Sequence, residues 1–160
     1  MLSREKFEND IRALKELCDN NLGKHERGLF CVSNSSIEWE GKVVVRQYHI
    51  IYSITYEVPT LWFNFYWKDG SLLKMDEIIE LVSSEYRQAV QNDRLISISQ
   101  GEHPYLGVAF YHIHPCRTQD IMSEIHTANY ILSWLSIYGR LVGLLLPNEI
   151  FSEGNQLDVF

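Results

Sequence analysis

The chain has 160 residues, of which 46% are hydrophobic and 12% aromatic, so it is long enough to bury a substantial core as one domain over residues 1–160. Its formal charge of -7, with no run of lysines or arginines, excludes a general nucleic-acid-binding protein, which needs a basic surface. The charged N-terminal residues predict no signal peptide, and the longest aliphatic run, Leu141 to Leu146, is too short to cross a bilayer. We therefore expect a cytosolic protein.

The first predicted element is an amphipathic helix that begins after Ser3, a favourable N-cap, and ends near Gly23. Its apolar residues recur at helical spacing: Phe7, Ile11, Leu14 and Cys18. Such a stripe is typical of a helix packed on a sheet. The three cysteines are widely spaced and odd in number, which fits a reducing compartment and predicts no disulfide framework.

A region rich in β-branched and aromatic residues follows, from Gly28 to Trp67. The predicted strands are Leu29–Ser33, Ile37–Trp39, the stretch Val43–Glu57 as one strand or a bent pair, and Leu61–Trp67. Glu40-Gly41-Lys42 predicts a hairpin turn, and Pro59 predicts a bend between strands. An overhanging hairpin here could add a strand from a partner along Val43 to Tyr52.

Helical patterns dominate the remainder of the chain. We expect a helix over Met75–Gln91, a short strand over Leu95–Ser99, a turn at Gly101–Pro104, a short helix capped by Thr118, and an apolar helix around Tyr130–Tyr138 that Thr127 could cap. This order of elements predicts an α+β fold, a single curved antiparallel sheet of about four or more strands with helices packed on it.

The most informative stretch is Gly107–Cys116, whose alternation of side chains predicts a strand that Pro115 ends. If the backbone stays extended, His112, His114 and Cys116 project to one side, so that two imidazoles lie near one sulfur. The following helix dipole and Arg117 would favour the thiolate. These are the usual ingredients of an activated cysteine nucleophile.

Other interpretations of the same residues stay open. Cys116 could be a small buried hydrophobic residue, or it could bind zinc together with His112, His114 and perhaps His103. No Cys-x-x-Cys pair accompanies them, although structural zinc sites usually have such pairs. A noncatalytic partner-binding module and a cysteine peptidase are further alternatives.

Three motifs occur along the chain: Tyr56-Glu57-Val58-Pro59, the run Ser99–Pro104, and His114-Pro115-Cys116 with Thr118. In this chain order they resemble the autophagy conjugating enzymes, which are distant relatives of ubiquitin-conjugating enzymes. The resemblance covers roughly Val43 to Pro147. Nothing between Trp67 and Leu95 has the length or composition of the flexible insertion found in the lipid-coupling branch, so the chain is similar to the protein-coupling branch.

The resemblance implies a ubiquitin-conjugating-enzyme-like fold and a function. Cys116 would accept the C-terminal carboxyl group of a ubiquitin-like autophagy modifier from an E1-like activating enzyme, as a thioester. It would then transfer the acyl group to a lysine of an acceptor protein. The resemblance implies neither a cofactor nor a metal. It places the protein in the cytoplasm, recruited to autophagosome-forming membranes through its partners.

One departure from ordinary ubiquitin-conjugating enzymes leaves a role to fill. Those enzymes carry a His-Pro-Asn motif before the cysteine, and its asparagine lies near the thioester; this chain has no His-Pro-Asn. The oxyanion that forms during transfer needs another donor. The candidates are His114 and Tyr56, for which a structural histidine and a core aromatic are the alternative interpretations.

Overall fold

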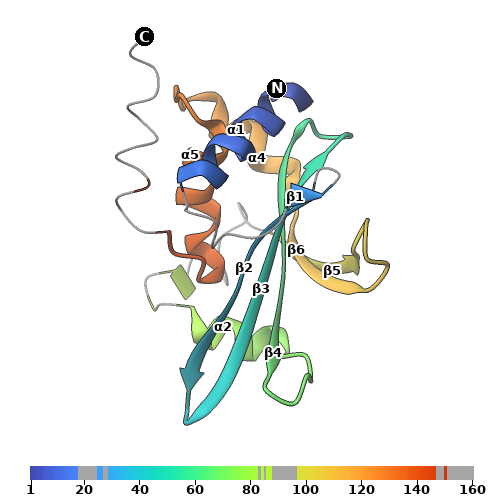
Figure 1. The fold of residues 1–160 in the computed structure, drawn as a ribbon, viewed down its shortest axis with the longest axis vertical. Coiled ribbons are helices and arrows are strands. Elements are labelled where there is room, and N and C mark those ends of the chain that lie inside the picture. Colours follow the sequence, from blue (N-terminus) through green and yellow to red (C-terminus); the bar gives the residue numbers. More distant parts are fainter. Residues whose placement is uncertain are drawn as a thin grey trace.

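The computed structural model describes residues 1–17, 25–26, 29–82, 84, 86–87, 97–146 and 150 (Figure 1). The helices within them are α1 (Arg4–Leu17), α2 (Met75–Leu81), the 3-10 helix η1 (Pro115–Arg117), α4 (Thr118–Ser123), α5 (Tyr130–Tyr138) and η2 (Arg140–Val142). The strands are β1 (His25–Glu26), β2 (Leu29–Trp39), β3 (Lys42–Ser53), β4 (Val58–Trp67), β5 (Ile98–Glu102) and β6 (Ala109–Ile113).

The strands form one six-stranded antiparallel sheet in the order β1-β2-β3-β4-β6-β5. Figure 1 shows α1, α4 and α5 gathered beside one side of the twisted sheet, while the β5–β6 hairpin bends away on the other side. The predicted α+β fold with a single antiparallel sheet is therefore confirmed.

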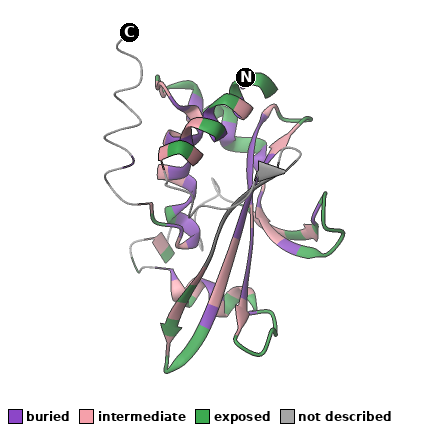
Figure 2. Cartoon of the chain, viewed as in Figure 1, coloured by how far each residue is buried: buried purple, intermediate pink, exposed green. Residues whose placement is uncertain are grey.

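The core lies between the helices and the sheet, where Figure 2 shows most of the buried residues. Alternate residues of the central strands point into it, and all are almost fully buried: Tyr48, Ile50, Leu61, Phe63 and Phe65. The predicted stripe of α1 is buried against them at Phe7, Ile11 and Leu14. The Ser3 side chain accepts from the Lys6 amide at 3.1 Å, which confirms the predicted cap.

Three expectations for residues 28–67 change in detail. The segments predicted as two strands form one strand, β2, with a register shift between Cys31 and Ser33. The long stretch from Val43 ends as a strand at Ser53, and residues 54–57 turn the chain. Pro59 makes no bend, because it lies inside β4 opposite Tyr52. The predicted turn at Glu40-Gly41 is confirmed, with φ angles of 51° and 72°.

The predicted helix over Met75–Gln91 is interrupted at Val82 rather than continuous. The structure ends α2 at Leu81, and Val82 is extended with ψ 141°. The Arg87 guanidinium takes up the free carbonyl groups at this end, since it donates to the Glu80 and Val82 oxygens. Beyond the break, Ser84, Tyr86 and Arg87 are again helical, whereas the other residues up to Gln91, like Gly23, Cys18 and Pro147, lie outside the described residues.

Three further details of element ends and caps differ from expectation. Gly101 and Glu102 belong to β5 rather than to a turn, which begins after His103. The cap of α5 is Asn129, whose side chain accepts from the Leu132 amide at 2.9 Å, rather than Thr127. Thr118 is the buried first residue of α4 and makes no capping hydrogen bond there.

In the middle of the sheet, β4 and β6 are joined by two residue pairs, Trp62 with His112 and Phe63 with Tyr111. Beyond them the side chain of Asn64 continues the pairing. Its Oδ1 accepts from the Tyr111 amide at 3.3 Å, and its Nδ2 donates to the Ala109 carbonyl at 2.8 Å. One buried side chain thus satisfies a backbone donor and a backbone acceptor of β6.

The face of the sheet away from the helices carries a histidine cluster, defined as His49, Trp62, His103, Phe110 and His112. Within it, His49 Nδ1 lies 2.8 Å from His103 Nε2, and the two residues are 3% and 0% exposed. His103 Nδ1 accepts from the amides of Tyr105 and Leu106 at 3.3 and 3.2 Å. The His103 proton must therefore be on Nε2, from which it is donated to His49.

We predict that this pair makes stability depend on pH. Burial, reinforced by the neighbouring His103, lowers the pKa of His49 from 6.5 to about 4, and burial lowers the pKa of His103 as well. Between these values the unfolded chain binds a proton that the native chain excludes, so the free energy of unfolding falls as pH falls from 6.5 toward 4. His49 alone accounts for a loss on the order of 3 kcal/mol, measurable as urea midpoints across this range.

The matched test replaces His49 with Phe, which can still stack on Phe110. The variant His49→Phe should be less stable at pH 7.5, because the His103 N–H loses its acceptor, but its stability should change less with pH. His126→Gln, at an exposed histidine, is the control. Equal pH dependence in His49→Phe and the parent chain would contradict the assignment.

Candidate active site

Cys116 lies in the middle of η1, directly after the strand β6. Pro115 cannot donate to a strand neighbour, and β6 ends two residues before it, at Ile113. The Cys116 side chain is exposed. The interpretation of this residue as a buried hydrophobic side chain is therefore wrong, and its side chain is accessible from solvent.

The predicted extended backbone to Cys116 does not persist beyond His114, because residues 115–117 wind into η1. The alternation that would bring His112, His114 and Cys116 to one side therefore fails at the cysteine. A different contact takes its place: His114 Nδ1 accepts a hydrogen bond from the Cys116 amide at 3.2 Å. Since Nδ1 is an acceptor, a neutral His114 carries its proton on Nε2.

Tyr56 lies against this histidine, although it is not in a strand. It belongs to the turn at residues 54–57, and its ring meets the His114 ring edge-on with centroids 5.5 Å apart. Glu57 closes the turn with φ 51°, and its carbonyl accepts from the Leu2 amide at 3.0 Å. Tyr56 is 40% exposed, so it is not a core aromatic.

The structure thus brings together Cys116, His114 and Tyr56, and leaves the other candidates elsewhere. His112 stacks on Trp62 with ring centroids 4.3 Å apart, and its buried Nδ1 makes no hydrogen bond with the described residues. Burial and then the neighbouring His114 lower the pKa of His112. His103 is hydrogen-bonded to His49 and does not reach Cys116. Sequence reasoning did not find the anchoring of the Tyr56 turn by Leu2, although the apolar residue before the Ser3 cap was a signal for it.

The zinc interpretation receives no support. Among the described residues, no three His, Cys, Asp or Glu side chains are grouped so that they could hold a metal ion. Arg117, expected to act on the thiol, lies 3.8 Å from the Asp120 carboxylate, and both side chains are largely exposed. The residues that the structure describes include no helix with the length and apolar character needed to span a membrane.

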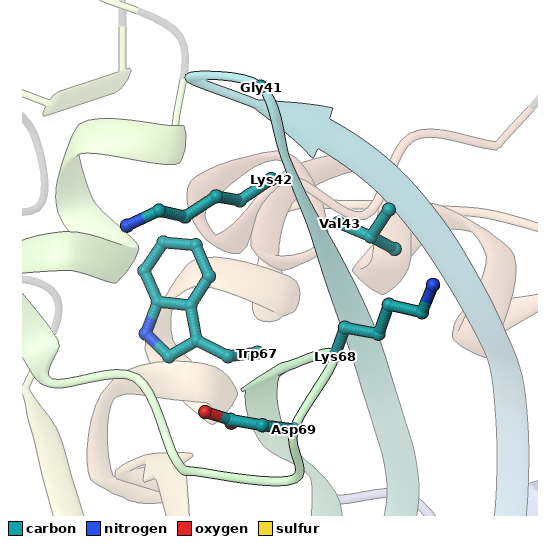
Figure 3. Close-up of a pocket in the computed structure, with 6 residues that line it drawn as sticks. All are labelled: Gly41, Lys42, Val43, Trp67, Lys68 and Asp69. Carbon is teal, nitrogen blue, oxygen red and sulfur yellow. The ribbon is translucent and has the colours of Figure 1, made fainter.

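A surface pocket lies far from Cys116. It has a volume of about 510 Å³ and is lined by residues at the ends of two hairpins: Gly41, Lys42, Val43, Trp67, Lys68 and Asp69 (Figure 3). The Lys42 ammonium lies 5.1 Å from the centre of the Trp67 ring. β3 and β4 run from this pocket to the Tyr56 turn, a separation of about 35 Å along the strands. The pocket is therefore not part of the site at Cys116.

The antiparallel sheet with helices on one face is a fold that this chain shares with solved structures of an autophagic E2. The chain resembles the crystal structure of the autophagic E2 Atg10 with a TM-score of 0.52, over 91% of this chain and 99% of that chain, at 19% identity. The solution structures of KmAtg10 give a TM-score of 0.51 over 90% and 97%, also at 19% identity.

The sequence comparison identifies the family. Residues 6–149 match the autophagocytosis associated protein, active-site domain, and the chain belongs to this family. Relatives named ubiquitin-like-conjugating enzyme ATG10 are 39% identical in Homo sapiens over 66% of this chain and 52% of that protein, and 34% identical in Arabidopsis thaliana over the same shares. The chain spans about half the length of these relatives.

Proposed function

We propose that the chain is an E2-like conjugating enzyme that carries a ubiquitin-like autophagy modifier as a thioester on Cys116. The observation that carries this proposal is the exposed thiol on η1, with its amide fixed by His114 and with Tyr56 beside that histidine. Membership of the active-site domain family and the printed names of the relatives support it. The partners would be an E1-like activating enzyme, the modifier, and an acceptor protein that bears a lysine.

The reaction consists of two acyl transfers without a change of oxidation state. The Cys116 thiolate attacks the carbonyl carbon of the modifier's C-terminal thioester on the activating enzyme, whose own cysteine leaves as a thiolate. The acceptor lysine amine then attacks the new thioester and loses a proton. The Cys116 thiolate leaves, and an isopeptide bond remains.

The second transfer, to lysine, passes through a tetrahedral oxyanion, and His114 is our first candidate to stabilise it. Its Nδ1 is held by the Cys116 amide, so the Nε2–H is the available donor, on a side chain fixed two residues from the sulfur. The Tyr56 ring restricts the rotation of this imidazole, and its hydroxyl is the second candidate donor. Fixing a donor before reaction avoids the cost of ordering it in the transition state.

The bond that forms at the Cys116 thiol tests directly whether the chain is a conjugating enzyme. With an activating enzyme, ATP and a candidate modifier, the chain should form an adduct that reductant removes on a gel. Cys116→Ser should form an adduct that resists reductant, because an oxyester replaces the thioester. Cys116→Ala should lose conjugate formation by roughly 10³-fold or more.

This test also separates the alternatives. If Cys116→Ala forms conjugate at the parental rate, the enzyme assignment is wrong and a noncatalytic binding module is favoured. Peptide-bond cleavage that depends on Cys116 would instead indicate the cysteine peptidase.

The donor assignment predicts a separate defect in the second transfer. His114→Ala should load the modifier but discharge it to lysine about 10²-fold more slowly, because the oxyanion loses its donor. Tyr56→Phe keeps the ring against His114 and should discharge at nearly the parental rate, whereas Tyr56→Ala should be slower by about tenfold. Single-turnover discharge of purified thioester measures these rates. A strong defect in Tyr56→Phe, with a normal His114→Ala, would transfer the donor role to the tyrosine hydroxyl.

We further propose that the enzyme acts in the cytoplasm and reaches autophagosome-forming membranes through its partners. The acidic composition and the absence of a membrane-spanning helix among the described residues are compatible with this location. Fractionation of cells that express a tagged chain, with and without the modifier's activating enzyme, would test it.

A further inference from the structure

Exposed apolar side chains gather on two turns at the end of the sheet that carries Tyr56. Five of the nine exposed large apolar residues in the described part of the chain lie there, and we call them the turn patch: Ile54, Tyr56, Tyr105, Leu106 and Val108. They are 75%, 40%, 48%, 48% and 52% exposed. So many solvent-facing apolar groups on two short turns mark an interaction surface.

Both turns are held firmly, so the patch is a formed surface. The β3–β4 turn is tied by the hydrogen bonds of Glu57, whose amide donates to the Ser53 carbonyl at 2.8 Å and whose carbonyl accepts from Leu2. The β5–β6 turn is tied by His103, whose amide donates to the Val108 carbonyl at 2.8 Å and whose ring accepts from two amides of the turn. Gly107 allows this turn to close, with φ 66°.

The two turns lie side by side. Ile54 and Tyr105 line the same small cleft, together with Tyr52 and Phe7. The charged residues at this cleft, Arg4 and Glu8, are paired with each other at 3.0 Å. Residues 54–56 and 105–108 carry no charged side chain, and Glu57, at the end of the first turn, is half-buried. The patch is therefore complementary to an apolar surface rather than to an acidic or basic one.

The patch is continuous with the cysteine. Tyr56 is one of its members and lies against the His114 ring, which in turn holds the Cys116 amide. A molecule bonded to Cys116 is therefore tethered next to these turns. A tether of a few extended residues raises the local concentration to the millimolar range, so even a weak apolar contact becomes occupied.

We propose that the turn patch binds an apolar face of the folded body of the ubiquitin-like modifier while its C-terminus is bonded to Cys116. The inference rests on the proposed function and names which partner the surface receives. Contact with the patch restricts the orientations of the modifier, and with them the orientation of the thioester carbonyl toward His114. Fewer unproductive orientations make acyl transfer to lysine faster.

The test compares Ile54→Ser, Leu106→Ser and the double variant with Val43→Ser in the full chain. Val43 is 39% exposed at the opposite end of β3, beside the pocket of Figure 3, and so is a matched control. Purified thioesters are discharged in single turnovers to free L-lysine and, separately, to the acceptor protein. The double variant should load within twofold of the parent chain but discharge to both amines about tenfold more slowly, and Val43→Ser should match the parent.

Three outcomes would overturn the inference. Slower loading with normal discharge would assign the patch to the activating enzyme. Normal discharge to free lysine with slow transfer to the acceptor protein would assign it to the acceptor. Parental rates throughout would show that the patch binds none of these partners.

Two measurements keep these outcomes interpretable. Urea midpoints of the single and double variants test unfolding as a cause, and they should stay near the parental value because the two altered side chains are 75% and 48% exposed. If the unaltered chain forms no thioester with any modifier, the proposed function itself has failed, and that result is seen before any variant is compared.

Discussion

Pro115 has no amide hydrogen, and the arrangement around the exposed sulfur follows from that missing donor. The chain leaves the sheet after Ile113 and winds into η1, which holds the Cys116 side chain in solvent. The amide of Cys116 would be an unpaired donor at the start of this helix, and the His114 ring accepts from it. The same hydrogen bond therefore caps the helix and fixes the imidazole beside the thiol.

The sheet supports this arrangement through its two different faces. The face toward the helices is packed with large apolar side chains from β3 and β4. The other face is partly polar, and the fully buried imidazoles of His49 and His103 are tolerated there because they hydrogen-bond to each other. That pairing positions the turn after β5, while Leu2 positions the turn after β3. The His49–His103 pair and the Leu2–Glu57 hydrogen bond thus hold two neighbouring turns at one end of the sheet.

The sequence was sufficient where a feature depends on nearby residues. The Ser3 cap, the stripe Phe7–Ile11–Leu14, the Glu40-Gly41 turn and the end of the cysteine strand all follow from local chemistry. It was insufficient where distant residues meet. The contact of Tyr56 with His114 and the pairing of His49 with His103 join residues 58 and 54 positions apart. The break after Leu81 is accompanied by hydrogen bonds from Arg87, a side chain that also fits a continuous helix.

Asn64 adds a property to the sheet that its strand order does not reveal. Its amide acts as a surrogate peptide group, offering one donor and one acceptor to β6 as a neighbouring backbone would. The four-stranded part, β1 to β4, and the two-stranded ribbon of β5 and β6 are therefore held together partly by a side chain, which a substitution can remove, and not by backbone pairing alone. Among the twenty amino acids only glutamine shares this chemistry, and its extra methylene would push the ribbon, with the cysteine that follows it, out of alignment.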